Sequence, residues 1–231
     1  MKDKIVFLHG LAGNNQGFFR LPCLAPILPG HQGISLDSYQ NLTDIANYVF
    51  QKIKDQEIKK PVVVGFSMGG LITLKMAKIK PRQIAKIVVW ASPVLGLNER
   101  AQKILKIVEL LPAWLFKTIQ NPTILGKISC LLKMPVGRSD LQVASQMKKQ
   151  DVLRLAAMMA KEKYDLKTPV RKLFIFGTND SLVDQENYDF VKQNKRSEDK
   201  VVLVKNGGHF GTEADWSKTY QVVEKFIGSE N

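Results

Sequence analysis

The sequence predicts an α/β protein with a mostly parallel sheet of about six strands, flanked by helices and interrupted by one helical insertion. Short apolar runs rich in Val, Ile and Phe alternate with segments of helical periodicity, which is typical of helices covering both faces of a sheet. The stretch "VGFSMGG" joins one of these runs directly to a helical pattern. In contrast, the interval 96–166 contains no run typical of a strand, so it predicts the insertion.

Size and composition limit the class of protein. The chain has 231 residues, 45% of them apolar, which is enough for one domain core but hardly for two independent domains. It shows no leader pattern and no apolar stretch of ~18 residues, so we expect a soluble, cytoplasmic protein. Cys23 and Cys130 lie far apart without metal-ligand spacing, and we expect no disulfide, no metal and no cofactor.

Apolar runs and stripes give the expected elements of the core in order. The runs expected to form buried strands are 4–9, 24–28, 61–66, 84–92, 170–177 and 200–205. A helix is expected after the second run, because Ile45, Val49 and Ile53 repeat every four residues. The last helix is expected from the stripe of Trp216, Tyr220, Val223 and Ile227. Both stripes should face the core.

Two amphipathic helices are expected inside the interval 96–166. One follows from the apolar spacing of Ile104, Ile107, Val108 and Leu111, and the other from that of Val152, Leu155, Ala156 and Met159. Prolines and glycines punctuate the sequence between them. We therefore expect a core formed by 1–95 and 167–231, with 96–166 as a helical insertion.

The glycines around Ser67 predict a sharp strand-to-helix turn. Gly65, Ser67 and Gly69 have the G-x-S-x-G spacing of a nucleophile elbow, in which a strained backbone points a serine hydroxyl out of the sheet. Side chains two positions on either side would collide with neighbouring backbone, and glycine removes that collision. The helix that begins here would also offer backbone N–H groups to a developing negative charge.

A serine hydroxyl needs a base and an orienting acid before it becomes a good nucleophile. His209 follows the last predicted strand in "KNGGHFGTEADW". Two carboxylates follow the fifth strand, and we favour Asp180 as the acid, with Asp184 expected to cap a helix beginning near Gln185. In the loop "FLHGLAGN", we expect the N–H of Leu11 to pair with that of Met68 as an oxyanion hole.

These motifs, in this order, resemble the serine α/β-hydrolase family over nearly the whole chain. The pieces that match are "HGLAGN", "PGHQGIS", "GFSMGG", "GTND" and "GGH". The resemblance implies that Ser67 attacks a carbonyl carbon, that His209 transfers the proton and that Asp180 stabilises the imidazolium. It also implies that 96–166 corresponds to the cap of that family, which closes over the active site and selects substrates.

Other positions follow from the same resemblance. His9 and His31 are implied to be structural members of their loops. Two departures stand out: Gln32 lies where the family usually continues with glycine, and the short spacing after "HGLAGN" implies that the first helix is short or missing.

The expected activity is hydrolysis of a carboxylic ester or thioester, as in a carboxylesterase, with a small-molecule acyl ester as substrate. Serine at residue 67 argues against dehalogenases and epoxide hydrolases, for which the resemblance implies aspartate. Two alternatives stay open, because a fold does not fix a function: a carbon–carbon bond hydrolase, and a non-catalytic ligand-binding protein on the same scaffold.

The net charge of +13 raises the question of a charged partner. Twelve basic and six acidic residues between 97 and 165 give this interval a net charge of +6. A basic insertion would favour an acyl group on an anionic handle, such as coenzyme A, an acidic acyl carrier or an anionic lipid surface. Basic residues do not cluster with aromatic ones, so nucleic acid is not an expected partner.

Overall fold

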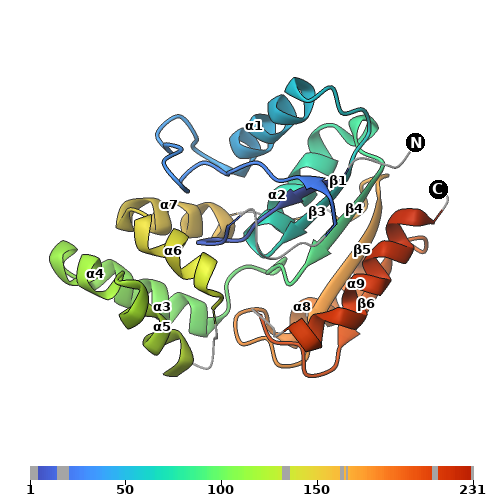
Figure 1. Ribbon diagram of the computed structural model, residues 1–231. Coiled ribbons are helices and arrows are strands. Elements are labelled where there is room, and N and C mark those ends of the chain that lie inside the picture. Colours follow the sequence, from blue (N-terminus) through green and yellow to red (C-terminus); the bar gives the residue numbers. More distant parts are fainter. Residues whose placement is uncertain are drawn as a thin grey trace.

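A computed structural model describes residues 5–14, 21–131, 136–161, 164, 166–209 and 213–229, without the side chains of 213–218. Six strands form one parallel sheet in the order β2-β1-β3-β4-β5-β6 (Figure 1). Their bounds are Ile5–Leu8 for β1, Cys23–Leu24 for β2, Val62–Phe66 for β3, Lys86–Trp90 for β4, Arg171–Gly177 for β5 and Lys200–Val204 for β6. The predicted α/β class and parallel sheet are confirmed, and five of the six expected runs contain a strand; the run expected at 24–28 overlaps β2 only at Leu24, because β2 ends there.

Helices follow each strand from β2 to β6. In the core they are α1 Leu42–Asp55, α2 Met68–Ile79, α8 Gln185–Asn194 and α9 Glu213–Gly228, with a short 3-10 helix at Pro81–Gln83. Between β4 and β5 lie α3 Glu99–Leu110, α4 Ala113–Ile119, α5 Pro122–Leu131, α6 Arg138–Gln146 and α7 Lys149–Ala160. No helix in the described part of the chain is long and apolar enough to cross a lipid bilayer.

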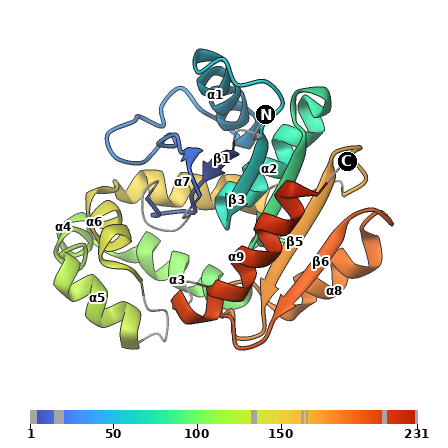
Figure 2. The ribbon, with the colours of Figure 1, turned by 45° about the vertical axis from the view of Figure 1, so that its right-hand side comes forward.

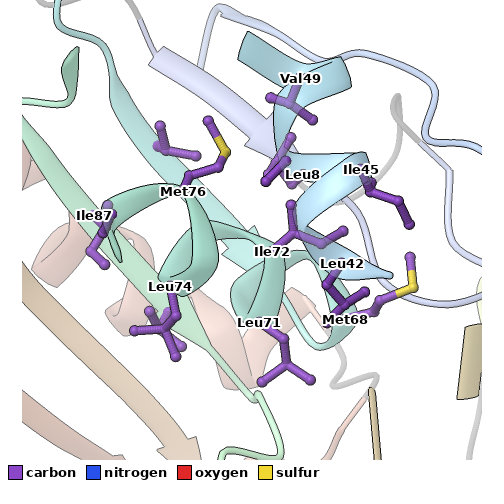
Figure 3. Packing of buried hydrophobic residues seen from close by; sticks show 14 of the residues in the cluster. Leu8, Leu42, Ile45, Val49, Met68, Leu71, Ile72, Leu74, Met76 and Ile87 are labelled. Carbon is purple, nitrogen blue, oxygen red and sulfur yellow. The ribbon is translucent and has the colours of Figure 1, made fainter. Parts of the chain in front are cut away.

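The strands bury both faces of the sheet. Val6 and Leu8 of β1 belong to one apolar cluster and Ile5 and Phe7 to another, as the alternation of side chains along a strand requires. The first cluster packs against α1, α2 and α8; Figure 3 shows its side chains between α1, α2, β1 and β4. The second cluster packs against α9, which lies in front of the strands in Figure 2.

The two predicted core-facing stripes behave as expected where the structure describes them. Ile45, Val49 and Ile53 are buried on α1, which begins with a capping box formed by Asn41 and Asp44. On α9, Val223 is buried, and Tyr220 and Ile227 are partly buried against the sheet. The side chain of Trp216 lies outside the described residues. Residues 9–14 and 21–22 form no helix after β1, and 15–20 fall outside the description.

Both amphipathic helices predicted within 96–166 are present, as α3 and α7, and only the apolar stripe of α7 is largely buried. On α7, the side chains of Leu155, Ala156 and Met159 are buried, and Leu155 and Met159 belong to the same apolar cluster as α1 and α2. On α3, Ile107 is 61% exposed, and Ile104 and Val108 are partly buried. The helix itself forms because Asn98 caps it, with its side-chain oxygen accepting the Ala101 N–H.

Side chains that donate to backbone carbonyls hold these helices in place. Lys149 Nζ donates to the carbonyls of Glu109 and Leu111, at 2.7 and 2.6 Å, and so satisfies the end of α3. Arg154 donates to the carbonyls of Leu36 and Tyr39, at 3.3 and 3.2 Å, and ties α7 to the loop after β2. These two cations therefore have structural roles and are not free surface charges.

Candidate active site

Ser67 is the single residue that connects the end of β3 at Phe66 to the start of α2 at Met68. Its backbone has φ 52° and ψ −118°, a left-handed conformation that costs a residue with a side chain free energy. The Ser67 N–H donates to the carbonyl of Trp90 at the end of β4, at 2.8 Å. This bond to the neighbouring strand helps to hold the strained turn.

Glycine is required on both sides of Ser67 by the packing of backbone against backbone. A Cβ atom on Gly65 would lie 2.3 Å from the carbonyl oxygen of Gly69. A Cβ atom on Gly69 would lie 2.1 Å from the carbonyl oxygen of Leu8. These distances are far inside van der Waals contact, so the spacing predicted from the motif has the predicted steric cause.

The structure brings Ser67, His209 and Asp180 together in one chain of hydrogen bonds. His209 Nε2 lies 3.1 Å from Ser67 Oγ, and His209 Nδ1 lies 2.8 Å from Asp180 Oδ2. With the ring proton on Nδ1, where it meets the carboxylate, Nε2 is free to accept the serine proton. The side chains of His209 and Asp180 are only 4% and 1% exposed, which keeps water from competing for these bonds.

Asp180 follows β5, and its own loop orients it. Its Oδ1 accepts the N–H groups of Leu182 and Val183, both at 2.9 Å, and lies 3.1 Å from His209 Nδ1, whereas Oδ2 lies closer to that nitrogen, at 2.8 Å. Asp184 lies elsewhere. It precedes α8 as expected, but its side chain does not cap that helix; instead, it accepts a hydrogen bond from Asn98 Nδ2 at 2.7 Å.

The loop after β1 lies directly against Ser67. A Cβ atom on Gly10 would be 3.1 Å from the Cβ of Ser67, so the following Leu11 is near the junction. Met68 is the first residue of α2, where a backbone N–H has no partner within the helix. Among the described residues, neither the Leu11 N–H nor the Met68 N–H donates to another group.

His9 and His31 bind loop backbone and lie in edge contact, with ring centroids 4.6 Å apart. His9 donates from Nδ1 to the Gly10 carbonyl and accepts the Leu28 N–H at Nε2. His31 donates from Nδ1 to the Pro29 carbonyl and accepts the Ala12 N–H at Nε2. Burial lowers the pKa of His9 to about 3 and that of His31 to about 4, which keeps both rings neutral.

Gln32, the departure noted in the sequence, also takes a left-handed backbone conformation, with φ 44°. The next residue, Gly33, has φ 85°. A side chain at position 32 is therefore accommodated in the turn, at some cost in conformational energy.

Two contacts near the site were not predicted from the sequence. Asn98 Nδ2 donates to the Ser181 carbonyl, 83 residues away, as well as to Asp184. Asn14 donates to Asp140 of α6, 126 residues away. No local pattern marks such pairs. Within the described ranges, no group of three or more His, Cys, Asp or Glu residues is arranged to hold a metal ion.

The chain is similar to known proteins in its sequence pattern and in its fold. A model of the alpha/beta hydrolase family matches residues 5–221. An esterase from Exiguobacterium antarcticum has a similar structure, with a TM-score of 0.73, 15% identity, and coverage of 98% of this chain and 92% of that chain. An enol-lactonase from Burkholderia xenovorans LB400 also has a TM-score of 0.73, with 14% identity over 98% and 92% of the two chains. At these identities, the likeness concerns the fold alone.

One curated relative matches over part of its sequence. It is the dihydrolipoyllysine-residue acetyltransferase component of an acetoin cleaving system from Pseudomonas putida, 32% identical over 102 residues. The match covers 40% of this chain and only 27% of that relative.

Proposed function

Because the chain belongs to the alpha/beta hydrolase family, we propose that it is a serine hydrolase that cleaves carboxylic esters or thioesters through an acyl-enzyme. The observation that carries this proposal is the hydrogen-bonded chain from Ser67 Oγ through His209 to Asp180. A binding protein would not need a base and an orienting acid aligned on a strained serine.

In the first half of the reaction, Ser67 Oγ attacks the carbonyl carbon while His209 Nε2 takes the hydroxyl proton. The Asp180 carboxylate stabilises the imidazolium that forms, and the bonds from Leu182 and Val183 fix its orientation. When the tetrahedral intermediate collapses, His209 returns the proton to the leaving alcohol or thiol. The acyl group is then bonded to Ser67.

In the second half, water attacks the acyl carbon, and His209 takes a proton from it as general base. The second tetrahedral intermediate releases the acid, and His209 returns the proton to Ser67 Oγ. The enzyme is restored, and the net reaction is ester plus water giving acid plus alcohol.

Both tetrahedral intermediates carry a negative oxygen, for which we assign the N–H groups of Leu11 and Met68. Support comes from the position of Met68 at the start of α2, where the helix dipole favours negative charge, and from the contact of the loop after β1 with Ser67. Donors that are not already engaged within the protein need not break a bond to receive the oxyanion.

We further propose that residues 96–166 act as a cap that selects substrates. Its helices α3–α7 follow the carboxyl end of β4, at the edge of the parallel sheet where Ser67, Asp180 and His209 also follow their strands. Within this cap, the exposed surface of α3 and α4 carries apolar Ile107, Leu110 and Trp114, which are 61%, 74% and 71% exposed. It also carries exposed Lys106 and Lys117, while Lys103 pairs with Glu99 at 3.0 Å and Glu109 is exposed on α3.

Such a face suits an acyl group carried on an anionic handle, whether coenzyme A, an acidic acyl carrier or an anionic lipid surface. For such a substrate, we expect kcat/KM to fall steeply with salt, because the Debye length shrinks to ~3 Å at 1 M ionic strength. Reversal of Lys106 and Lys117 to glutamate should reproduce part of that fall at low salt, whereas a neutral short ester should be indifferent to both changes. Equal indifference of the anionic substrate would overturn this choice of partner.

The proposed activity is tested by a screen of p-nitrophenyl and thioester substrates with graded acyl chains. The best substrate is then given to the Ser67→Ala variant, for which kcat should fall by about 10⁴-fold or more while the fold is kept, since members of the triad act as a unit. Turnover that survives in this variant would contradict the proposal. Hydrolysis of a 1,3-diketone but of no ester would favour the carbon–carbon hydrolase instead.

A further inference from the structure

The cap and the loop after β1 are joined by one carboxylate. Asp140 Oδ1, in the first turn of α6, accepts the backbone N–H of Asn14 at 3.0 Å and its side-chain Nδ2–H at 2.6 Å. Asn14 is only 6% exposed, and Asp140 is largely covered. A single oxygen therefore receives two donors from a loop 126 residues earlier in the chain.

That loop carries Leu11, and two further hydrogen bonds hold it without involving residues 96–166. The Gly13 N–H donates to the Gly10 carbonyl at 3.1 Å and closes a tight turn around Leu11. The Ala12 N–H donates to His31 Nε2 at 3.1 Å, while Ala12 itself has a left-handed φ of 59°. Asp140 adds an anchor at the far end of the turn, and this anchor comes from the cap.

We propose that Asp140 is a positioning residue, which holds the turn at 10–14 so that the Leu11 N–H points where the Met68 N–H points. This inference rests on the proposed function, because it assigns a role to the oxyanion hole assumed there. It means that the Leu11 N–H is correctly placed for the oxyanion hole only when α6 is packed so that Asp140 can bind Asn14. The cap then contributes to the rate of the chemical step as well as to the choice of substrate.

A carboxylate is well suited to this place. It lies near the N-terminus of α6, where the helix dipole favours negative charge. Charge-assisted hydrogen bonds from two N–H groups are stronger than bonds to a neutral acceptor. Burial raises the pKa of Asp140, and the two bonds from Asn14 oppose that rise.

The test compares Asp140→Ala with Asp140→Asn on the best ester found for the wild-type protein. In the alanine variant, we expect kcat to fall by about 10- to 100-fold with KM within about threefold, because an oxyanion donor acts in the transition state; losing one outright costs about 10²- to 10³-fold. Affinity for a trifluoromethyl ketone, which forms an oxyanion adduct with the serine, should weaken by the factor lost from kcat/KM. The asparagine variant keeps an oxygen acceptor and should stay within about threefold of wild type.

Matched variants separate positioning from general damage. Asp37→Ala removes the exposed ion pair with Arg154 on α7, another contact between cap and core, and should leave kcat unchanged. Titration of active sites with a serine-directed phosphonate corrects every rate for protein that has not folded. If Asp140→Ala does not fold, Asn14→Ala removes the Nδ2 donor to Asp140 and keeps the backbone donor, and it should lower kcat several-fold.

The outcomes distinguish this inference from the proposed function. Unchanged kcat in Asp140→Ala, or a rise in KM alone, would overturn the positioning role while loss of turnover in Ser67→Ala still supports the serine hydrolase. Turnover that survives in Ser67→Ala would overturn the proposed function, and this inference with it.

Discussion

The junction between β3 and α2 and the helices α3–α5 differ in what surrounds their residues. At the junction, every residue from 65 to 70 is buried, and the glycines meet backbone atoms of neighbouring elements. On α3–α5, Leu110, Trp114 and Leu131 are 74%, 71% and 83% exposed. The backbone at the junction is restricted to one conformation, and its glycines cannot be replaced without a clash, because backbone packs directly on backbone. The helices of the cap have room to change sequence, which suits a part that we propose selects substrates.

Asp180→Asn should have the largest effect of the substitutions near the junction between β3 and α2. The amide would disfavour the histidine tautomer that accepts the serine proton, and loss of the charge removes the partner of the imidazolium, so we expect kcat to fall by about 10⁴-fold. Asp184→Asn is the matched control, because its amide oxygen can still accept from Asn98, and kcat should stay within about threefold. The reverse pattern in steady-state kinetics would move the acid to Asp184.

Gly69→Ala tests the backbone packing of the junction. The new Cβ would lie 2.1 Å from the Leu8 carbonyl oxygen, so β1 or α2 must shift, and we expect a loss of more than about 3 kcal/mol in the free energy of unfolding. Urea denaturation measures it. Gly228→Ala, where nothing lies within 4 Å of the new Cβ, should change stability by less than about 1 kcal/mol. Similar values for the two variants would contradict the steric account.

Acid should weaken the loops held by His9 and His31. Their folded-state pKa values, about 3 and about 4, lie below the ordinary value of 6.5, so the unfolded chain binds protons first. Their stabilisation is complete above pH 6.5 and is lost as the pH falls, by about 1 to 2 kcal/mol between pH 6.5 and 5.5.

Urea denaturation at several pH values between 6.5 and 5.5 measures how steeply the free energy of unfolding depends on pH. In His31→Gln, the amide oxygen can still accept the Ala12 N–H but does not titrate, so the slope should be smaller. A slope that is absent in wild type, or unchanged in the variant, would contradict the assignment.

Gly126→Ala tests how tightly the helices of the cap are packed, relative to the junction. Gly126 lies inside α5, and its new Cβ would meet only the flexible end of Leu141, at 3.3 Å. Alanine favours a helix over glycine by about 1 kcal/mol, so stability should rise by up to that amount. A loss as large as that of Gly69→Ala would show that the cap is packed as tightly as the junction.

The features predicted correctly from the sequence are those that neighbouring residues determine. The spacing of Gly65, Ser67 and Gly69 encodes a collision within one turn, and the structure has the strain and close contacts that it implies. The order of Ser67, Asp180 and His209 along the chain placed them after three strands whose carboxyl ends meet at one edge of the sheet. Their catalytic roles stay predictions.

The features that the sequence did not reveal depend on distant partners. Ile107 has the spacing of a packed residue, but no element covers it among the described residues. The helices α4–α6 are short, so their periodicity is too brief to detect. The bonds of Asn14 to Asp140 and of Asn98 to Ser181 join segments more than eighty residues apart, and they follow only from the packed fold.

The central claim is that Ser67 is the nucleophile, and the most direct measurement is mass spectrometry of the protein after reaction with a serine-directed phosphonate. We expect one adduct per chain, located by peptide mapping on Ser67, with loss of ester hydrolysis in proportion to labelling. The Ser67→Ala variant should remain unlabelled. An adduct on another residue, or full hydrolysis by protein that is fully labelled at Ser67, would contradict the claim.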